Sequence, residues 1–358
     1  MQPKLSGPMK TNKMTSRPVL LDMDPGVDDA LAIILAMQSP EIDVKAITVC
    51  GGNVGVEQCA LNALKTLEEI NPQSCPPVSM GAWRPVRRSP FRAGGIHGPD
   101  GLGNVLAKYP NPALDKIDKR PAVDLILETL RSLPPQTLTI VATAPLTNIA
   151  LAISKDPEAV RRVKRIVWMG GAFKIHGNIS PVAEFNAFCD PDAAAEVLTF
   201  GVPTTIVGLD ACMQCPLIRN DLRKIKDKSG LSAFAWDISK MYMDFYLKNE
   251  TFDGCYLHDP LAVGVAIWED LIIEQKTYQV EVVTEPGIAF GQTIIDRRPR
   301  NPWHNQLYRN AYDRLAEAAP GDIGLLQDIA VCNKPPQVSV VFSVDGSEFK
   351  KRFLERIL

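Results

Sequence analysis

Hydrophobic positions along the chain follow two alternating patterns. Short apolar and β-branched runs predict strands at residues 19–21, 44–49, 77–80, 138–141, 165–168, 204–207, 278–283, 293–296 and 337–344. Between them, apolar residues recur at helical spacing and predict helices at residues 28–37, 56–69, 123–133, 146–154, 191–199, 217–248 and 347–358. The strands are apolar throughout, which is typical of strands buried on both faces.

These repeated strand–helix units predict one α/β domain with a mainly parallel, Rossmann-like central sheet and helices on both faces. We place this domain at residues 17–358 and expect residues 1–16 to form a disordered tail. The Gly-, Pro- and Arg-rich stretch at residues 81–111 is expected to be a long loop. Ligands of such sheets bind beyond the carboxyl ends of the strands, so residues that directly follow strands are the first candidates for a site.

Composition narrows the possible partners. The chain has 358 residues, and its 39 Lys and Arg against 41 Asp and Glu give a net charge of −2. This balance disfavours a nucleic-acid partner, and no run of about 18 apolar residues predicts a membrane span. Without a visible signal peptide, the eight scattered cysteines are expected to be reduced thiols of a cytoplasmic protein. Cys212 and Cys215 have CxxC spacing but no second pair nearby, which favours buried thiols over a zinc site.

Four carboxylates lie within eight residues at the end of the first predicted strand: Asp22, Asp24, Asp28 and Asp29. Helix capping can account for Asp28 and Asp29, but not for Asp22 and Asp24 on a buried strand, where alternation points both the same way. So many negative charges resist burial unless a cation joins them. Oxygen ligands favour Ca²⁺ or Mg²⁺ over zinc, so this segment predicts a metal site.

The carboxylate run resembles the signature of the nucleoside hydrolases, the inosine–uridine-preferring ribohydrolases. Further motifs agree in the same order: GN at 52–53, IHG at 96–98, TAPLTN at 143–148, MGG at 169–171, AEFN at 183–186 and HDP at 258–260. The resemblance implies Ca²⁺-dependent hydrolysis of ribonucleosides to ribose and free base. It also implies a homodimer or homotetramer.

The resemblance further implies a role for each site residue. One Ca²⁺ would be bound by Asp24, Asp29, the main-chain carbonyl of Thr143, and Asp259. Asp24 would also be the general base that activates water, and His258 would protonate the departing base. The sugar hydroxyls would be held by Asp28, Asn53, Asn178, Glu184 and Asn186. The base would lie against His97, Tyr242 and Tyr246.

Some of these residues have simpler interpretations. Asn53 and Asn178 are also typical turn residues. Tyr242 and Tyr246, one helical turn apart, could equally be core aromatics. We expect residues 184–186 to be extended, with both polar side chains facing the ligand and Phe185 packing away. We expect Asp22 to lie behind the site and to orient either Asp24 or the turn that follows it.

Two rival functions fit parts of the pattern. A Mg²⁺-dependent phosphatase of the haloacid-dehalogenase type also uses Asp-x-Asp at a strand end. Such enzymes usually carry Thr or Val where Gly26 stands here, and they lack the His-Asp-Pro motif. A non-catalytic ribose or nucleoside binder is the other alternative, but binding alone requires neither a base at Asp24 nor an acid at His258.

Overall fold

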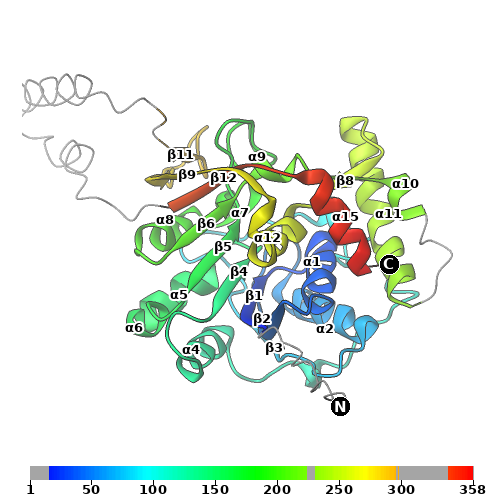
Figure 1. Cartoon of the computed structure of the whole chain (residues 1–358), viewed down its shortest axis with the longest axis horizontal. Coiled ribbons are helices and arrows are strands. Elements are labelled where there is room, and N and C mark those ends of the chain that lie inside the picture. The colour runs from blue at the N-terminus through cyan, green and yellow to red at the C-terminus, as the bar shows by residue number, and fades with distance from the viewer. Residues whose placement is uncertain (1–15, 224–229, 296, 298–337, 358) are drawn as a thin grey trace, which may run out of the picture.

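The centre of the molecule is a sheet of eight strands among the described residues, in the order β3-β2-β1-β4-β5-β6-β12-β9 (Figure 1). The strands are β1 (Arg17–Met23), β2 (Ile42–Val49), β3 (Val78–Met80), β4 (Thr139–Ala142), β5 (Arg165–Met169), β6 (Thr204–Val207), β9 (Ile272–Tyr278) and β12 (Val338–Val344). Only β9 is antiparallel to its described neighbour; the other neighbouring pairs are parallel. The predicted α/β class with a mainly parallel sheet is confirmed, and the order of the first six strands is Rossmann-like.

The computed structural model describes residues 16–223, 230–295, 297 and 338–357. The predicted tail at residues 1–16, apart from Ser16, therefore lies outside the described residues.

Helices cover both faces of the sheet and enclose two hydrophobic cores. One face carries α1 (Val27–Met37), α2 (Val56–Ile70), α11 (Leu231–Glu250), α12 (His258–Ile267) and α15 (Gly346–Ile357). The other carries α4 (Ala122–Ser132), α5 (Thr147–Lys155) and α8 (Pro191–Thr199). Successive strand residues serve opposite faces, so Leu21 joins the first core and Leu20 the second.

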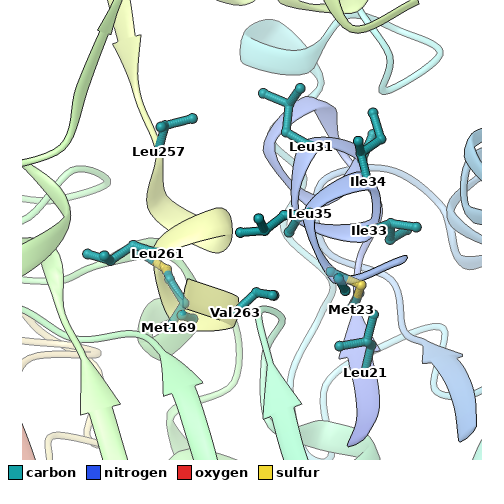
Figure 2. Close-up of a cluster of buried hydrophobic side chains, with 14 of the residues drawn as sticks. Leu21, Met23, Leu31, Ile33, Ile34, Leu35, Met169, Leu257, Leu261 and Val263 are labelled. Atoms are coloured by element: carbon teal, nitrogen blue, oxygen red, sulfur yellow. The ribbon is translucent and has the colours of Figure 1, made fainter. Parts of the chain in front are cut away.

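The packing of α1 against α12 matters most for the site. In Figure 2, Leu35 of α1 and Val263 of α12 point toward one another, and both are fully buried. Each such apolar side chain contributes about 1.5–3 kcal/mol when buried. Through this packing the N-terminal turns of the two helices lie beside one another. Both turns carry acidic residues: Asp28 and Asp29 in α1 and Asp259 in α12.

The largest departure from the predicted elements lies between residues 216 and 267. The single helix predicted at 217–248 is divided into β7 (Pro216–Ile218), α10 (Arg219–Arg223) and α11, and residues 224–229 lie outside the described part. Gly230, with φ +65°, directly precedes α11. We did not predict α12 because every one of its residues is buried, so it has no polar face to produce a helical period.

Smaller differences concern short elements. The strand predicted at 278–283 is the end of β9 followed by β10 (Val280–Val282), which pairs with β11 (Thr293–Ile295) in a separate sheet. β7 pairs with β8 (Gly254–Tyr256), and the expected loop at 81–111 contains α3 (Gly94–His97). The remaining short helices are η1 (Leu114–Lys116), α6 (Pro157–Val160), α7 (Phe185–Cys189), α9 (Leu209–Cys212) and η2 (Glu269–Leu271).

The seven described cysteines are free, and Cys212 and Cys215 are both buried. Cys332 lies outside the described residues. In the part of the chain that the structure describes, no helix combines the length and the apolar character needed to cross a membrane.

Candidate active site

A single cavity collects most of the predicted site residues beyond the carboxyl ends of the parallel strands. Those that line it are Asp24, Asp28, Asn53, His97, Thr143, Asn178, Asn186, Tyr242, Tyr246, His258 and Asp259. Two predicted residues, Asp29 and Glu184, lie behind this lining and hydrogen-bond to residues within it. Their position follows from the topology, because β1, β2, β4 and β5 all end at this edge.

Asp24 follows β1 directly and is 1% exposed. Its Oδ2 accepts a hydrogen bond from the Asn53 amide at 2.7 Å, whereas its Oδ1 has no hydrogen-bond partner. The neighbouring backbone approaches so closely that a Cβ at Gly52 would lie 1.9 Å from Oδ2. The Asp24 carboxylate can therefore occupy this position only because residue 52 is glycine.

The first turn of α1 supplies two further carboxylates. Asp29 accepts hydrogen bonds from the Gly26 amide at 2.9 Å and the Thr143 hydroxyl at 2.7 Å. The Asn53 side chain donates to both Asp29, at 3.1 Å, and the Asp24 carbonyl, at 3.1 Å. Asp29 therefore does cap the N-terminus of α1, as considered from the sequence. Its bond to Thr143 also connects α1 to the end of β4.

The acidic residues form a cluster suited to a cation. Asp28, Asp29 and Asp259 each offer a carboxylate oxygen within 4.8 Å of the others. Asp28 Oδ1, like Asp24 Oδ1, is buried without a hydrogen-bond partner. The ligand atoms are all oxygens, which suits a hard divalent cation. We expected Asp28 to hold sugar; the structure adds it to the potential metal ligands.

Burial and mutual repulsion make these carboxyl groups hard to ionise. Burial, with repulsion from Asp29, raises the pKa of Asp24 well above its usual range. Burial, with repulsion from Asp28, does the same to the pKa of Asp259. Burial also raises the pKa of Asp28 and of Asp29 to about 6. A bound cation would offset this cost, so the residues fit the metal that the sequence predicts.

Amide groups line the side of the cavity near β4 and β5. The Asn186 side chain donates to the carbonyls of Thr143, at 2.9 Å, and Met169, at 3.1 Å. Glu184 caps α7 and accepts from the amides of Asn186, Ala187 and Gly171. Our expectation of an extended segment here is wrong, because α7 begins at Phe185. As a consequence Phe185 lines the cavity rather than packing away from it.

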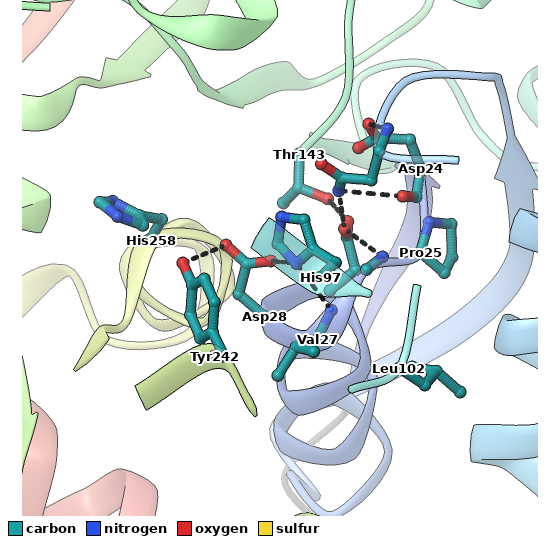
Figure 3. Close-up of polar contacts among 12 residues, drawn as sticks. Asp24, Pro25, Val27, Asp28, His97, Leu102, Thr143, Tyr242 and His258 are labelled. Carbon is teal, nitrogen blue, oxygen red and sulfur yellow. Dashed lines mark hydrogen bonds and ion pairs between the residues drawn. The ribbon is translucent and has the colours of Figure 1, made fainter. Parts of the chain in front are cut away.

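The opposite side of the cavity is aromatic. His97 stacks on Tyr242 with ring centroids 5.2 Å apart and an interplanar angle of 23°. The amide of Val27 donates to His97 Nδ1 at 3.2 Å, and burial lowers the pKa of His97 to about 4. In Figure 3, Asp28 lies between Tyr242 and His97, so the aromatic side and the acidic cluster meet at this carboxylate.

A chain of hydrogen bonds runs along the aromatic side to His258. The Tyr242 hydroxyl donates to Asp28 Oδ2 at 3.4 Å and lies 3.5 Å from the Tyr246 hydroxyl. The Tyr246 hydroxyl is in turn 3.1 Å from His258 Nε2, while Nδ1 is buried without a partner. Burial lowers the pKa of His258 to about 4. The two tyrosines therefore have a polar role that core aromatics do not need.

Sequence reasoning missed several lining residues, mostly apolar: Ala93, Ile96, Met169, Ile179, Phe185, Phe245, Asn249 and Glu250. A usable signal existed for three of them. Phe245, Asn249 and Glu250 follow Tyr242 and Tyr246 at spacings of three or four along α11, so they share the same helix face.

Fold and site together define an α/β protein that gathers carboxylates and amides beyond its strand ends, opposite aromatic and histidine side chains. The chain belongs to the inosine-uridine preferring nucleoside hydrolase family, whose profile matches residues 19–351. This confirms the resemblance carried by the motifs. Members of this family are glycosidases that act on ribonucleosides, and the phosphatase alternative is not supported.

Individual relatives agree with this assignment. The inosine-uridine preferring nucleoside hydrolase of Leishmania major is 38% identical over 289 residues, which cover 80% of this chain and 90% of the relative. Uridine nucleosidase 1 of Arabidopsis thaliana is 37% identical over 292 residues, covering 80% and 85%. The solved structure of a plant nucleoside hydrolase, PpNRh1, superposes with a TM-score of 0.82 at 30% identity, covering 96% of this chain and 99% of that one.

Proposed function

We propose that this chain hydrolyses the N-glycosidic bond of ribonucleosides, giving ribose and free base, with Ca²⁺ as its metal. The observation that carries the proposal is the division of the cavity into an acidic, amide-rich side and an aromatic side. Ribose hydroxyls need both donors and acceptors, which the first side offers. A flat, apolar base suits the second side.

The charge of the cavity favours nucleosides over nucleotides. The side chains around it include Asp24, Asp28, Asp259 and Glu250, and Lys and Arg are absent from these lining residues. A phosphate group would face several carboxylates without a cationic side chain to receive it.

The metal would be held by Asp24, Asp29, Asp259 and the Thr143 carbonyl, with Asp28 close by. When bound, Ca²⁺ supplies positive charge that offsets these carboxylates, binds hydroxyl oxygens and favours the ionisation of water. We choose Ca²⁺ because it accepts about 6–8 oxygens in flexible geometry, which leaves room for substrate.

We assign the role of general base to Asp24. Its Oδ1 is free of protein partners, and Asn53 holds the other oxygen in place. In the proposed step Asp24 takes a proton from water as the water oxygen bonds to the anomeric carbon. The C–N bond breaks, and its electron pair leaves with the base.

In the same proposal His258 supplies the proton that the departing base needs. If Tyr246 donates to Nε2, the ring proton sits on Nδ1, which is buried without a protein partner, and in the proposed step this proton passes to the base. Because its pKa is low, His258 can give up this proton only as another arrives. Tyr246, Tyr242 and Asp28 form a continuous hydrogen-bonded path for that replacement. Along it a protonated Asp28 gives its proton to Tyr242, Tyr242 gives one to Tyr246, and Tyr246 gives one to His258 Nε2, so the Tyr242–Asp28 hydrogen bond reverses during the transfer.

The remaining residues bind substrate. Sugar contacts come from Asp28, Asn53, Asn178 and Asn186, with Glu184 holding the α7 turn that presents Asn186. His97, Tyr242 and Tyr246 face the base. A site built only for binding would need neither the open Asp24 oxygen nor the path to His258, which argues against a non-catalytic binder.

Turnover by purified protein tests the proposal. Inosine, uridine, cytidine, adenosine and guanosine are each incubated with the enzyme, and free base and reducing sugar are measured. We expect stoichiometric release of both from at least one nucleoside. Release of phosphate from nucleotides without base release, or tight nucleoside binding without turnover, would overturn it.

We further propose that residues 17–358 act as one catalytic unit, in the cytoplasm, as a homodimer or homotetramer. The family profile, which spans most of the chain, supports one unit. Analytical ultracentrifugation of the full chain measures the oligomeric state directly; a monomer at assay concentration would contradict it.

A further inference from the structure

Asn148 is fully buried in the first turn of α5 and is not among the residues that line the cavity. Its side chain nevertheless makes two hydrogen bonds to segments that lead into the site. Nδ2 donates to Asp22 Oδ1 at 2.9 Å, and Oδ1 accepts from the Ala82 amide at 2.9 Å. One amide group therefore joins the end of β1 to the loop after β3.

The first of these bonds acts on the strand that carries Asp24. Asp22 is the second residue before Asp24 and is fully buried. The same Asp22 oxygen accepts from the Thr48 hydroxyl at 2.6 Å, and the Asp22 carbonyl accepts from the Thr143 amide at 2.9 Å. Asp22 is thus held from β2, β4 and α5 at once, which limits where the following Asp24 can lie.

The second bond acts on the loop that begins at Gly81. A Cβ on Gly81 would lie 2.1 Å from Asn148 Oδ1, so the loop passes directly against this side chain. The Ala82 carbonyl accepts from the Gly51 amide at 2.8 Å, which fixes both polar groups of that residue. Onward, the loop reaches Ala93 and His97, which line the cavity.

The neighbouring residue supports the same loop at a second point. The Thr147 hydroxyl donates to Asp190 Oδ2 at 2.7 Å, and that oxygen accepts from the Val86 amide at 2.9 Å. Consecutive residues of α5 therefore hold two points of the loop, but only Asn148 also contacts β1.

We propose that Asn148 is a positioning residue. It holds Asp24 and the loop that runs from Gly81 to His97 in a fixed position relative to one another. The proposal rests on the proposed function, since Asp24 is the base only in that reaction. An error of about 1 Å in a reacting group can cost on the order of 10²-fold in rate, even when the substituted residue is remote. Asn148 is suited to prevent such an error because its donor binds Asp22 of β1 while its acceptor binds the Ala82 amide of the loop.

Asn148→Asp distinguishes the bond to Asp22 from the bond to Ala82, because it removes the donor and keeps the acceptor. The substituted side chain still accepts from the Ala82 amide but turns a carboxylate oxygen toward Asp22. We expect kcat for inosine and for p-nitrophenyl riboside to fall about 10²-fold with KM within a few-fold. Hydrogen exchange at the Ala82 amide, measured by mass spectrometry, should stay close to that of the wild type. Asn148→Ala should lower kcat and also speed this exchange.

The decisive variant combines Asn148→Asp with Asp22→Asn. Donor and acceptor then exchange places, and the hydrogen bond between the two positions can form again in the reverse direction. The Thr48 hydroxyl, which donates to the same Asp22 oxygen in the wild type, can instead accept from the new amide and donate to the Leu21 carbonyl, 3.4 Å away. We expect the double variant to recover kcat to within about tenfold of the wild type. Thr129→Val, which removes one buried hydroxyl from α4 at a residue that does not line the cavity, is the control for general loss of stability.

Three results would overturn the proposal. They are wild-type kcat in Asn148→Ala, a double variant no better than the worse single variant, or a kcat loss in Thr129→Val equal to that in Asn148→Ala. If even the wild-type enzyme hydrolyses no nucleoside, the proposed function fails instead. The exchange measurement then still shows whether Asn148 holds the loop, because it does not depend on turnover.

Discussion

Individual atoms of the site show which groups are committed to structure and which remain free for chemistry. Both oxygens of Glu184 are occupied by backbone amides, whereas Asp24 and Asp28 each keep one buried oxygen without a hydrogen-bond partner. An unpartnered buried carboxylate oxygen is costly, and a ligand bound to these two oxygens in the cavity would offset that cost.

Asp24→Asn tests the base at this scale. The substitution preserves shape but removes the proton acceptor and one negative ligand, so kcat should fall on the order of 10²–10⁴-fold. Steady-state kinetics with the best nucleoside measures the effect, and circular dichroism confirms the fold. Activity within tenfold of the wild type would exclude Asp24 as the base.

His258→Ala separates leaving-group protonation from sugar binding. For inosine we expect a loss of kcat on the order of 10²-fold with little change in KM, because the lost proton transfer belongs to the transition state. p-Nitrophenyl riboside has a leaving group that needs no proton, so it should be hydrolysed nearly as well as by the wild type.

The matched control for this prediction is Asn186→Ala. It should slow both substrates alike, because ribose is common to them. Equal slowing of both substrates by His258→Ala would make the histidine structural.

At the scale of elements, the site is built from turns that follow strands. α1 and α12 bring their first turns together, and the β2–α2 turn closes over Asp24. The close approach of the β2–α2 turn to Asp24 leaves no room for a side chain at Gly52.

Gly52→Ala and Gly55→Ala test this tolerance within one turn. The first places a methyl group 1.9 Å from Asp24 Oδ2, whereas the second meets nothing within 4 Å. We expect Gly52→Ala to lower kcat about 10²-fold by displacing Asp24, and Gly55→Ala to keep wild-type kcat. Equal kinetics in the two variants would show that the close approach has no functional consequence.

The parallel sheet and its strand ends were predictable because buried strands give continuous apolar runs. Asp24, Asn53 and Thr143 could be placed on that basis alone. α12 could not, because it lacks a polar face, and neither could the start of α7, whose capping residue Glu184 acts through backbone amides. Asn148 was visible only as part of a motif, since its two partners are 126 and 66 residues away along the chain.

For the whole molecule, the buried carboxylates lower the free energy of unfolding, and a bound cation can offset this loss. Asp24, Asp29 and Asp259 all have raised pKa values, chiefly from burial. A ligand that binds only the folded chain stabilises it by mass action.

Calcium should therefore raise the melting temperature of chelator-treated protein. At about 100 times the dissociation constant, the gain in unfolding free energy is about 2.7 kcal/mol. For a chain of this length that corresponds to a rise of roughly 4 °C by scanning calorimetry. Elemental analysis should find about one Ca²⁺ per chain.

Asp259→Asn provides the control, because it removes one ligand and should abolish most of the calcium-dependent rise. An equal rise in this variant, or zinc bound at Cys212 and Cys215 instead of calcium, would contradict the proposed site.

The position of β12 has a consequence for the newly made protein. Although it comes from the last part of the chain, β12 lies between β6 and β9, inside the sheet. A nascent chain that has emerged through β9 still lacks this strand, so β6 presents an open edge to which other chains can add. With translation proceeding at about 5–20 residues per second, that edge stays open for seconds. The sheet can close only after residues 338–344 have been made, so β6 must be shielded from association until β12 arrives.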